Sequence, residues 1–236
     1  MAVFEALPAL ASQASAAPAA PQPVVVMSGL VALVLSLIVW PVVGFAVVLA
    51  HEGGHAVTAS MMGGTVKSIH MYGKNDSRGR GLTRATGLGP VGGLLMLLGG
   101  SLGPSIFGLG GAVLLTGGHS DAVLWISLVF LLLALLQMKN VIGGMVAVAT
   151  GAVIFLVLRY GSPDGRTFFA YTWVWFLLFG GFGHVVASHW HRGDAGTLKQ
   201  KTWVPVMLWS AFFGMATLAA LGYGAGILLN IVHPGR

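Results

Sequence analysis

Six apolar stretches constrain this chain more than any other feature of its sequence. They cover roughly 24–62, 87–118, 121–138, 140–159, 167–188 and 203–230. A helix that spans a bilayer needs about 20 mainly apolar residues, and charged residues make up only 8% of the chain, against about a quarter in a soluble domain. We therefore expect an all-α polytopic membrane protein, with about six transmembrane helices in contact with the lipid bilayer.

The ends of the chain and its composition narrow the organisation further. Residues 1–23 are rich in Ala and Pro and contain no basic residue, so they lack the positive start of a signal peptide. We expect a flexible, uncleaved tail there and a single membrane-embedded helical domain over 24–236. Cysteine is absent, which excludes disulfides and thiolate metal ligands. In a soluble protein the net charge of +6 would suggest nucleic acid. Here we assign it to loops at the membrane surface and expect no nucleic-acid partner.

The basic residues predict an orientation in the membrane, because Lys and Arg accumulate in cytoplasmic loops. With the N-terminus outside, nine of the twelve fall on the cytoplasmic side: Lys67, Lys74, Arg78, Arg80, Arg84, Lys139, Arg192, Lys199 and Lys201. Arg159, Arg166 and Arg236 fall outside. We therefore expect a multi-pass membrane protein with both termini outside.

The loop 63–86 and the apolar stretch 87–118 each carry residues that predict their local structure. The loop 63–86 contains "GGTVKSIHMYG", the turn cluster "NDSRGRG" and "LTRATG", a pattern typical of a short β-hairpin. We place this hairpin at the cytoplasmic face, after the first transmembrane helix. The stretch 87–118 carries Pro104 inside it, so it is either one kinked helix or a broken one.

The first apolar stretch contains "HEGGH" at residues 51–55. On a helix, His51 and His55 share one face about one turn apart, so the two imidazoles could hold one Zn²⁺. Glu52 could then take a proton from water that zinc activates. The alternative is a helix that simply leaves the membrane here, with its polar residues at the interface. Three ionisable residues at one depth are costly in a membrane, which favours the metal site.

These residues lie in "VVLAHEGGHAVTASMMGGTVKSI", which resembles the first core helix of the site-2 protease family of intramembrane zinc metallopeptidases, in particular its small bacterial members without a PDZ domain. Four further pieces also resemble that subgroup: "LLGGSLGPSIFGLGGAVLL", "KNVIGG", "FLLFGGFGHVV" and "GDAGTLKQKTWVPVMLW". The resemblance implies that His51 and His55 bind zinc and that Glu52 activates water for proteolysis within the membrane. It also implies that Asn140 helps to bind the substrate; the alternative for Asn140 is a buried polar contact between helices. The bacterial members of the subgroup imply a location in a bacterial cell (inner) membrane.

The third zinc ligand does not follow from the resemblance, because the usual Asp-Gly pair is missing after Asn140. His184 is our first choice, since it lies near the cytoplasmic end of the fifth span and neutral imidazole binds zinc well. Asp194 is the alternative, and a site without a third protein ligand is also open. The other aspartates lie at the outer ends of spans or in the hairpin loop and are poorer candidates: Asp76, Asp121 and Asp164.

Two functions remain in view. The first is an intramembrane zinc metalloprotease that cleaves single-span membrane proteins. The second is a non-catalytic, degenerate relative that acts as a scaffold or subunit of a larger membrane complex, which the missing Asp-Gly pair favours. A transporter is a weaker third possibility, because few charges lie in the middle of the predicted spans.

Overall fold

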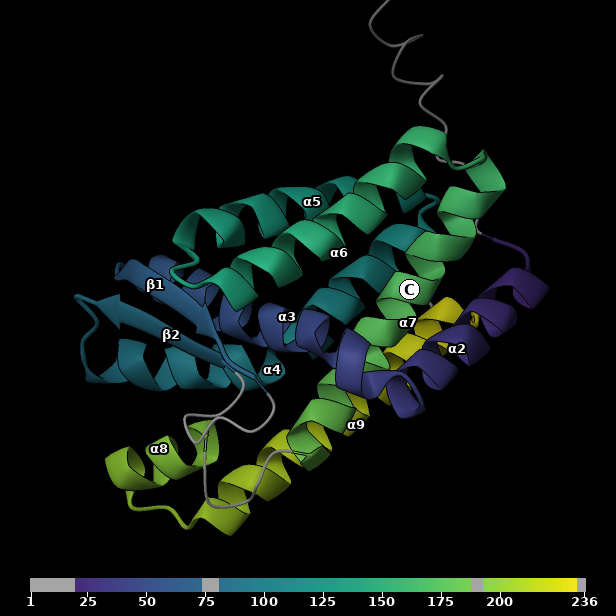
Figure 1. The fold of residues 1–236 in the computed structure, drawn as a ribbon. Helices are drawn as coiled ribbons and strands as arrows, with labels where there is room; N and C mark the ends of the chain where they lie inside the picture. The colour runs from purple at the N-terminus through teal and green to yellow at the C-terminus, as the bar shows by residue number, and fades with distance from the viewer. Residues whose placement is uncertain (1–19, 74–80, 188–192, 233–236) are drawn as a thin grey trace, which may run out of the picture.

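The computed structural model describes residues 20–73, 81–187 and 193–232, which form a helical bundle with one small sheet (Figure 1). Within these residues, six helices are long and apolar enough to cross a membrane: α3 (Trp40–Met61), α4 (Pro90–Thr116), α5 (Ser120–Gln137), α6 (Val141–Tyr160), α7 (Pro163–Ala187) and α9 (Val206–Leu228). The prediction of an all-α multi-pass membrane protein is confirmed. Most of the predicted N-terminal tail lies outside the described residues.

The first apolar stretch forms two helices, where the sequence predicts one continuous helix to about residue 62. Helix α2 (Gln22–Leu37) ends three residues before α3 begins at Trp40. The break follows from Pro41, the second residue of α3. In a continuous helix its ring would clash with the carbonyl group four residues earlier, at Leu37, which is where α2 ends.

Helix α4 runs through Pro104 without a break, so the stretch 87–118 is one helix. Its glycines bring it very close to α3. A Cβ atom on Gly54 of α3 would lie 2.3 Å from the carbonyl oxygen of Gly99 and 3.0 Å from the Cα atom of Gly103. Small residues allow membrane helices to approach at the backbone, and here they join the helix that carries the HEGGH segment to α4.

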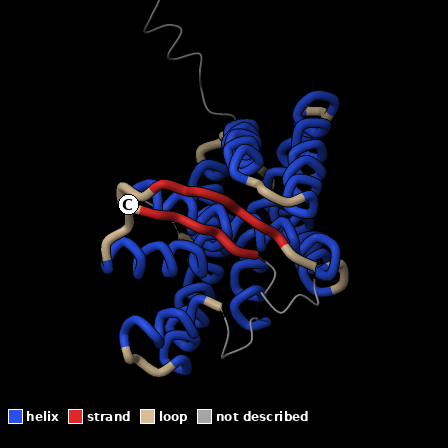
Figure 2. Tube along the Cα trace, turned by 60° about the vertical axis from the view of Figure 1, so that its left-hand side comes forward, coloured by secondary structure: helices blue, strands red, loops and turns tan. Residues whose placement is uncertain are grey.

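The predicted β-hairpin is confirmed. Strands β1 (Thr65–Met71) and β2 (Gly81–Thr86) pair antiparallel, with an irregularity between Val66 and Ser68. Figure 2 shows the two strands lying across one end of the helix bundle. The backbone N–H of Lys139 donates to the carbonyl of Ile69 over 3.0 Å, so the connection between α5 and α6 pairs with the outer edge of β1.

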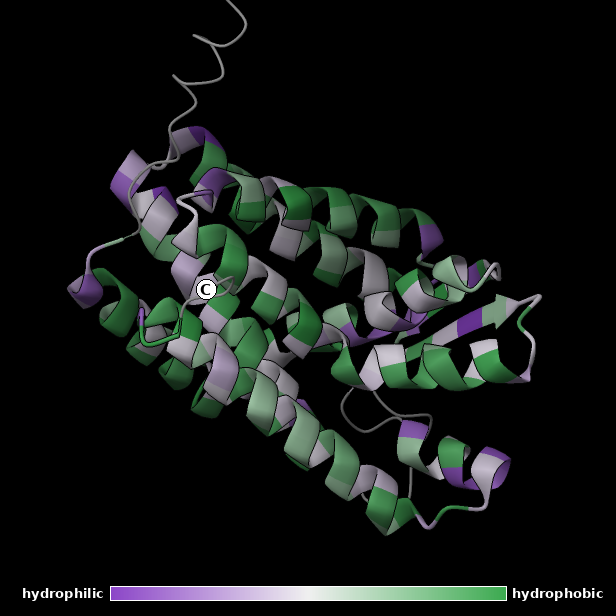
Figure 3. Ribbon diagram, turned by 180° about the vertical axis from the view of Figure 1, so that it is seen from behind, coloured by the Kyte–Doolittle hydropathy of each residue, from purple (hydrophilic) through white to green (hydrophobic). Residues whose placement is uncertain are grey.

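The last part of the bundle adds a short polar helix, α8 (Asp194–Thr202), between α7 and α9. Figure 3 shows hydrophilic residues in α8 and the hairpin, whereas the long helices are largely hydrophobic. Leu198 and Phe213 are buried in a small apolar cluster that joins α8 to α9. This packing fixes the first residue of α8, Asp194, near α4.

Candidate metal centre

Two histidines of α3 lie side by side at the predicted helical spacing. The Nε2 atoms of His51 and His55 are 3.1 Å apart, and the two rings are perpendicular, with centroids 4.7 Å apart. The side chain of His55 lies at the contact between α3 and α4, where the chain offers space because residue 100 is glycine. A Cβ atom there would lie 2.0 Å from Cε1 of His55.

Asp194 completes the group from a distant part of the chain. Its Oδ2 atom is 3.3 Å from Nε2 of His51 and 3.4 Å from Nε2 of His55. The hydroxyl of Ser101 on α4 donates a hydrogen bond of 2.7 Å to the same oxygen. Helix α8 thus presents a carboxylate to the two imidazoles, and α4 holds that carboxylate in place.

The charge state of Asp194 suits a metal ligand. Burial acts to raise the pKa of the Asp194 carboxyl, but His55 and His51 oppose it, together with hydrogen bonds from His55 and Ser101, and the pKa is held well below its ordinary value. The side chain is therefore an ionised carboxylate at neutral pH, which is the form that binds a metal.

The three donor atoms fit a zinc ion. Zinc binds histidine nitrogen and carboxylate oxygen at about 2.0–2.2 Å in tetrahedral geometry, so neighbouring ligand atoms lie about 3.3–3.6 Å apart. The three distances here are 3.1, 3.3 and 3.4 Å. Among the described residues, this is the group of His, Asp and Glu side chains whose ligand atoms converge closely enough to hold a metal. Three protein ligands leave a fourth position open, as in catalytic zinc sites.

A contact with the backbone of α4 orients the ring of His55. Nδ1 of His55 is 2.8 Å from the carbonyl oxygen of Met96 on α4. A carbonyl only accepts, so we assign the proton to Nδ1, which leaves the lone pair of Nε2 directed at the other donors. Zinc-binding histidines usually have such a partner on the second nitrogen, which fixes the tautomer and the ring orientation.

Glu52 lies beside the three donor residues and is only 3% exposed. The hydroxyl of Thr83 on β2 lies 2.7 Å from its Oε2 atom and 3.0 Å from its backbone carbonyl. A Cβ atom on Gly81 would lie 2.3 Å from Oε1, so the hairpin closes tightly over this carboxylate. A buried carboxylate with one hydroxyl donor is a suitable proton acceptor next to a metal site.

The remaining predicted residues lie close to the centre but are engaged differently. The ring of His184 on α7 packs against that of His51, with centroids 4.7 Å apart and a tilt of 53°. The side chain of Asn140 bonds the backbone of Met71 in β1: its Nδ2 donates to the carbonyl, and its Oδ1 accepts from the N–H over 3.1 Å. His184 therefore lies beside His51 but is not among the three residues whose donor atoms converge, and Asn140 joins the α5–α6 connection to the hairpin.

The weaker aspartate candidates lie away from the centre. Asp121 forms an ion pair of 2.7 Å with Arg166, which ties the start of α5 to α7. Asp164 lies in the first turn of α7, and Asp76 is outside the described residues.

Three contacts of the centre are not evident from the sequence. Ser101 contacts Asp194, and Thr83 contacts Glu52. The carbonyl of Met96 contacts His55. Serine and threonine are common in membrane helices and strands, so their residue types carry no signal by themselves. The one available signal for Ser101 is its place in a glycine-rich stretch, which marks a close helix contact.

Comparison with known protein families gives a match over most of the chain. The family model described as Peptidase M50B-like matches residues 24–224, which run from the third residue of α2 to within four residues of the end of α9. No curated protein and no solved structure matches the chain.

Proposed function

We propose that this chain, which belongs to the Peptidase M50B-like family, hydrolyses peptide bonds of membrane proteins at a zinc ion held by His51, His55 and Asp194. The family is zinc-dependent and comprises membrane metallopeptidases of the site-2 protease type. The observation that carries the proposal is the convergence of these three donor atoms beside a buried Glu52. Asp194 takes the place of the Asp-Gly aspartate that the sequence lacks.

The residues of the chain then have distinct roles in the reaction. Zinc, when bound, supplies a Lewis acid that polarises the peptide carbonyl and lowers the pKa of water. Glu52 accepts one proton from the attacking water as the oxygen of that water bonds to the carbonyl carbon. Glu52 then delivers the proton to the peptide nitrogen as the C–N bond breaks, which yields an amine and a carboxylic acid that loses its remaining proton to solvent at neutral pH. Thr83 holds the carboxylate of Glu52 in place through both steps.

The proposed substrate is a single-span membrane protein whose helix unwinds locally, because a helix hides its peptide carbonyls in its own hydrogen bonds. An extended segment can add to the edge of a sheet. The edge of β1 is already paired with the α5–α6 connection, whereas the described residues place no strand beside the other edge, on β2. Strand β2 also contacts Glu52 through Thr83. We therefore propose that the substrate strand adds along β2.

The test separates a catalytic base from a ligand. Glu52→Gln keeps the shape of the side chain but removes the proton acceptor, so the variant should contain about one zinc per chain and cleave nothing. Asp164→Asn is the matched control, since it makes the same chemical change at an exposed carboxylate in the first turn of α7. Zinc is measured by elemental analysis, and cleavage on a reconstituted panel of single-span bacterial membrane proteins. If wild type and Glu52→Gln are equally inert but support the same cellular function, the chain is a scaffold and not a protease.

The proposed orientation places both termini outside a bacterial cell membrane. Two connections, α4–α5 and α6–α7, then lie outside, and they are joined by the Asp121–Arg166 ion pair. A cysteine at Ser162 should react in intact cells with a membrane-impermeant thiol reagent, and one at Thr197 in α8 should not. The reverse labelling pattern would invert the topology.

A further inference from the structure

We propose that an apolar cavity beside the metal centre binds a large apolar side chain of the substrate, close to the scissile bond. This inference rests on the proposed function and names the feature by which the site would select its substrates. The cavity has a volume of about 270 Å³ and is enclosed by α3, α4, α5 and α7. A cavity of about 150 Å³ lined by similar residues can hold a benzene molecule, so this one has room for an aromatic or a large aliphatic group.

The cavity begins next to the centre. Its wall on α3 includes Leu49 and Ala50, the two residues that precede His51. Phe130 of α5 also lines it, and a Cβ atom on Gly53 would lie 2.0 Å from Cζ of that ring. The cavity wall and the HEGGH segment are therefore in direct contact at the Gly53–Phe130 pair.

The distance along α4 also suits a side chain near the scissile bond. Ser101 bonds Asp194, and Ile106 is the first residue of α4 in the cavity wall. Five residues of helix rise by about 8 Å, whereas an extended chain advances by about 3.3–3.6 Å per residue. A side chain within three residues of the scissile bond can therefore enter the cavity.

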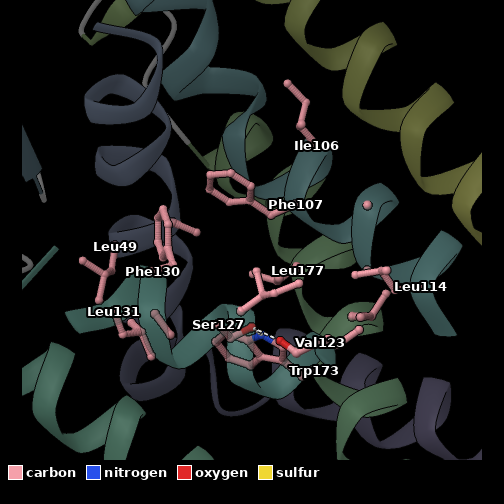
Figure 4. Close-up of a pocket in the computed structure, with 16 residues that line it drawn as sticks. Leu49, Ile106, Phe107, Leu114, Val123, Ser127, Phe130, Leu131, Trp173 and Leu177 are labelled. Carbon is pink, nitrogen blue, oxygen red and sulfur yellow. Dashed lines mark hydrogen bonds between the residues drawn. The ribbon is translucent and has the colours of Figure 1, made fainter. Parts of the chain in front are cut away.

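The polar groups of the wall are already paired, so the cavity favours an apolar ligand. The indole N–H of Trp173 donates to the hydroxyl of Ser127 over 3.1 Å, and that hydroxyl donates to the carbonyl of Val123 over 2.8 Å. Figure 4 shows this pair at one end of the cavity and the rings of Phe107 and Phe130 at the other. Those two rings contact edge to face, with centroids 4.9 Å apart. A polar side chain would lose its hydration there without a new partner.

The cavity also opens towards the surface from which a membrane substrate would arrive. Ile106 on α4 and Ile126 on α5 line it and are 53% and 57% exposed. Both belong to helices of membrane-spanning length, so this opening faces lipid. The substrate is itself a membrane span, and its side chain can reach the cavity without passing through water.

One glycine allows the cavity to be filled without disturbing the fold. Gly110 lines the cavity, and a Cβ atom built on it meets no atom within 4 Å. Gly110→Leu should therefore occupy the space that the substrate side chain needs. Gly222→Leu on α9 is the matched control, because a Cβ atom there also has open space and the residue is not part of the wall.

The experiment uses the purified protein in bilayers with a synthetic single-span peptide. The peptide has a Leu/Ala helix with a central Gly-Ser pair, and each of the three residues on either side of that pair is varied in turn among Ala, Leu and Phe. At one position, wild type and Gly222→Leu should cleave the Phe or Leu peptide at least about 10-fold faster than the Ala peptide, the discrimination typical of an apolar pocket. Gly110→Leu should lose that preference and still cleave the Ala peptide. Equal cleavage of all peptides, or an unchanged preference in Gly110→Leu, would overturn the pocket while leaving proteolysis intact.

A binding measurement tests the pocket even if no peptide is cleaved. The Glu52→Gln variant is irradiated with the same peptide carrying a benzophenone at the varied position, and the cross-linked residues are mapped by mass spectrometry. Cross-links to α4 or α5 around Phe107 and Phe130 support the pocket, and they should disappear in Gly110→Leu but not in Gly222→Leu. In a parallel sample, phosphatidylcholine vesicles carry a diazirine on the acyl chain. Labelling of the cavity by the lipid in the presence of the peptide would identify it as a lipid site and overturn the inference.

Discussion

Helices α3 and α6 have similar lengths, 22 and 20 residues, but they pack in opposite ways. Helix α6 is the more apolar of the two, yet only 17% of its most apolar window is buried in the protein, against 56% for α3. In water the more apolar helix would be the more buried. In a membrane, apolar side chains gain little by moving from lipid into the protein interior, because both are apolar. Close helix contacts depend instead on small residues and on hydrogen bonds between polar groups.

The glycines of the two helices show the same difference. A Cβ atom on Gly54 of α3 would meet the backbone of α4 at 2.3 Å, whereas one on Gly144 of α6 would meet no atom within 4 Å. The helix that carries the HEGGH segment is thus fixed by backbone contacts with α4. Helix α6 is mainly exposed, and it packs chiefly on α5, with smaller contacts to α3, the hairpin and α7. We expect substitutions to have large effects on the first helix and small effects on the second.

The largest effect should come from removing a metal-binding atom from the proposed centre. Asp194→Ala should lower zinc affinity by more than roughly 10- to 100-fold, which is the typical loss when a residue that contacts a metal ligand is removed. Asp121→Ala is the control, since it removes an exposed carboxylate of α5 that pairs with Arg166. Zinc affinity is measured by competition with a chelator.

The same measurement decides between the two candidates for the third ligand. His184 contacts the ring of His51 but lies outside the group of converging donors. His184→Ala should therefore lower zinc affinity by about 10- to 100-fold, as is typical for a residue that contacts a metal ligand and not the metal. If His184→Ala loses more zinc than Asp194→Ala, the ligand assignment is reversed.

The next prediction compares the same substitution at Gly54 and Gly144. Gly54→Ala should destabilise the protein by about 3 kcal/mol, at the upper end of the range for overpacking, because the backbone of α4 cannot rotate away as a side chain can. Gly144→Ala should change stability by less than about 0.5 kcal/mol. Unfolding in a detergent titration measures both. Equal stability of the two variants would mean that α3 and α4 are not held by this close approach.

The sequence predicts well the features that depend on composition or on local spacing. The membrane helices follow from the length of the apolar stretches, the hairpin from its turn residues, and the pairing of His51 with His55 from the four-residue interval. The same local rules apply to Pro41, whose position explains the break between α2 and α3 once the structure is known. The break is not evident from the sequence because apolar residues continue on both sides of Pro41.

The proposed third ligand could not be derived in the same way. Asp194 lies 139 residues after His55 and reaches it only because α8 folds back onto α4. That fold depends on the packing of Leu198 and Phe213 and on the hydrogen bond from Ser101, which are contacts between distant segments. His184 matched the predicted depth, and it does lie beside His51, but depth alone does not say which atoms converge.

The smallest predicted effect concerns the hairpin, which joins the buried centre to the surface. Thr83 reaches from β2 to Glu52, and its hydroxyl bonds the Oε2 atom over 2.7 Å. Thr83→Val keeps the shape of the side chain but removes the hydrogen bond. A hydrogen bond to a charged group contributes about 1.5–3 kcal/mol, and each 1.4 kcal/mol corresponds to a factor of ten in rate. We therefore expect kcat to fall by at least about 10-fold, the lower end of this range, at unchanged zinc content.

The controls for Thr83 distinguish positioning of Glu52 from a general weakening of the hairpin. Thr86→Val makes the same change at the exposed end of β2 and should leave kcat within about twofold, since surface changes have small effects. Thr83→Ser restores the hydroxyl and should recover most of the activity, with KM close to that of the wild type. If Thr83→Val raises KM and leaves kcat unchanged, Thr83 contributes to binding the substrate strand. If Thr83→Val and Thr86→Val behave alike, the hydrogen bond to Glu52 has no part in catalysis.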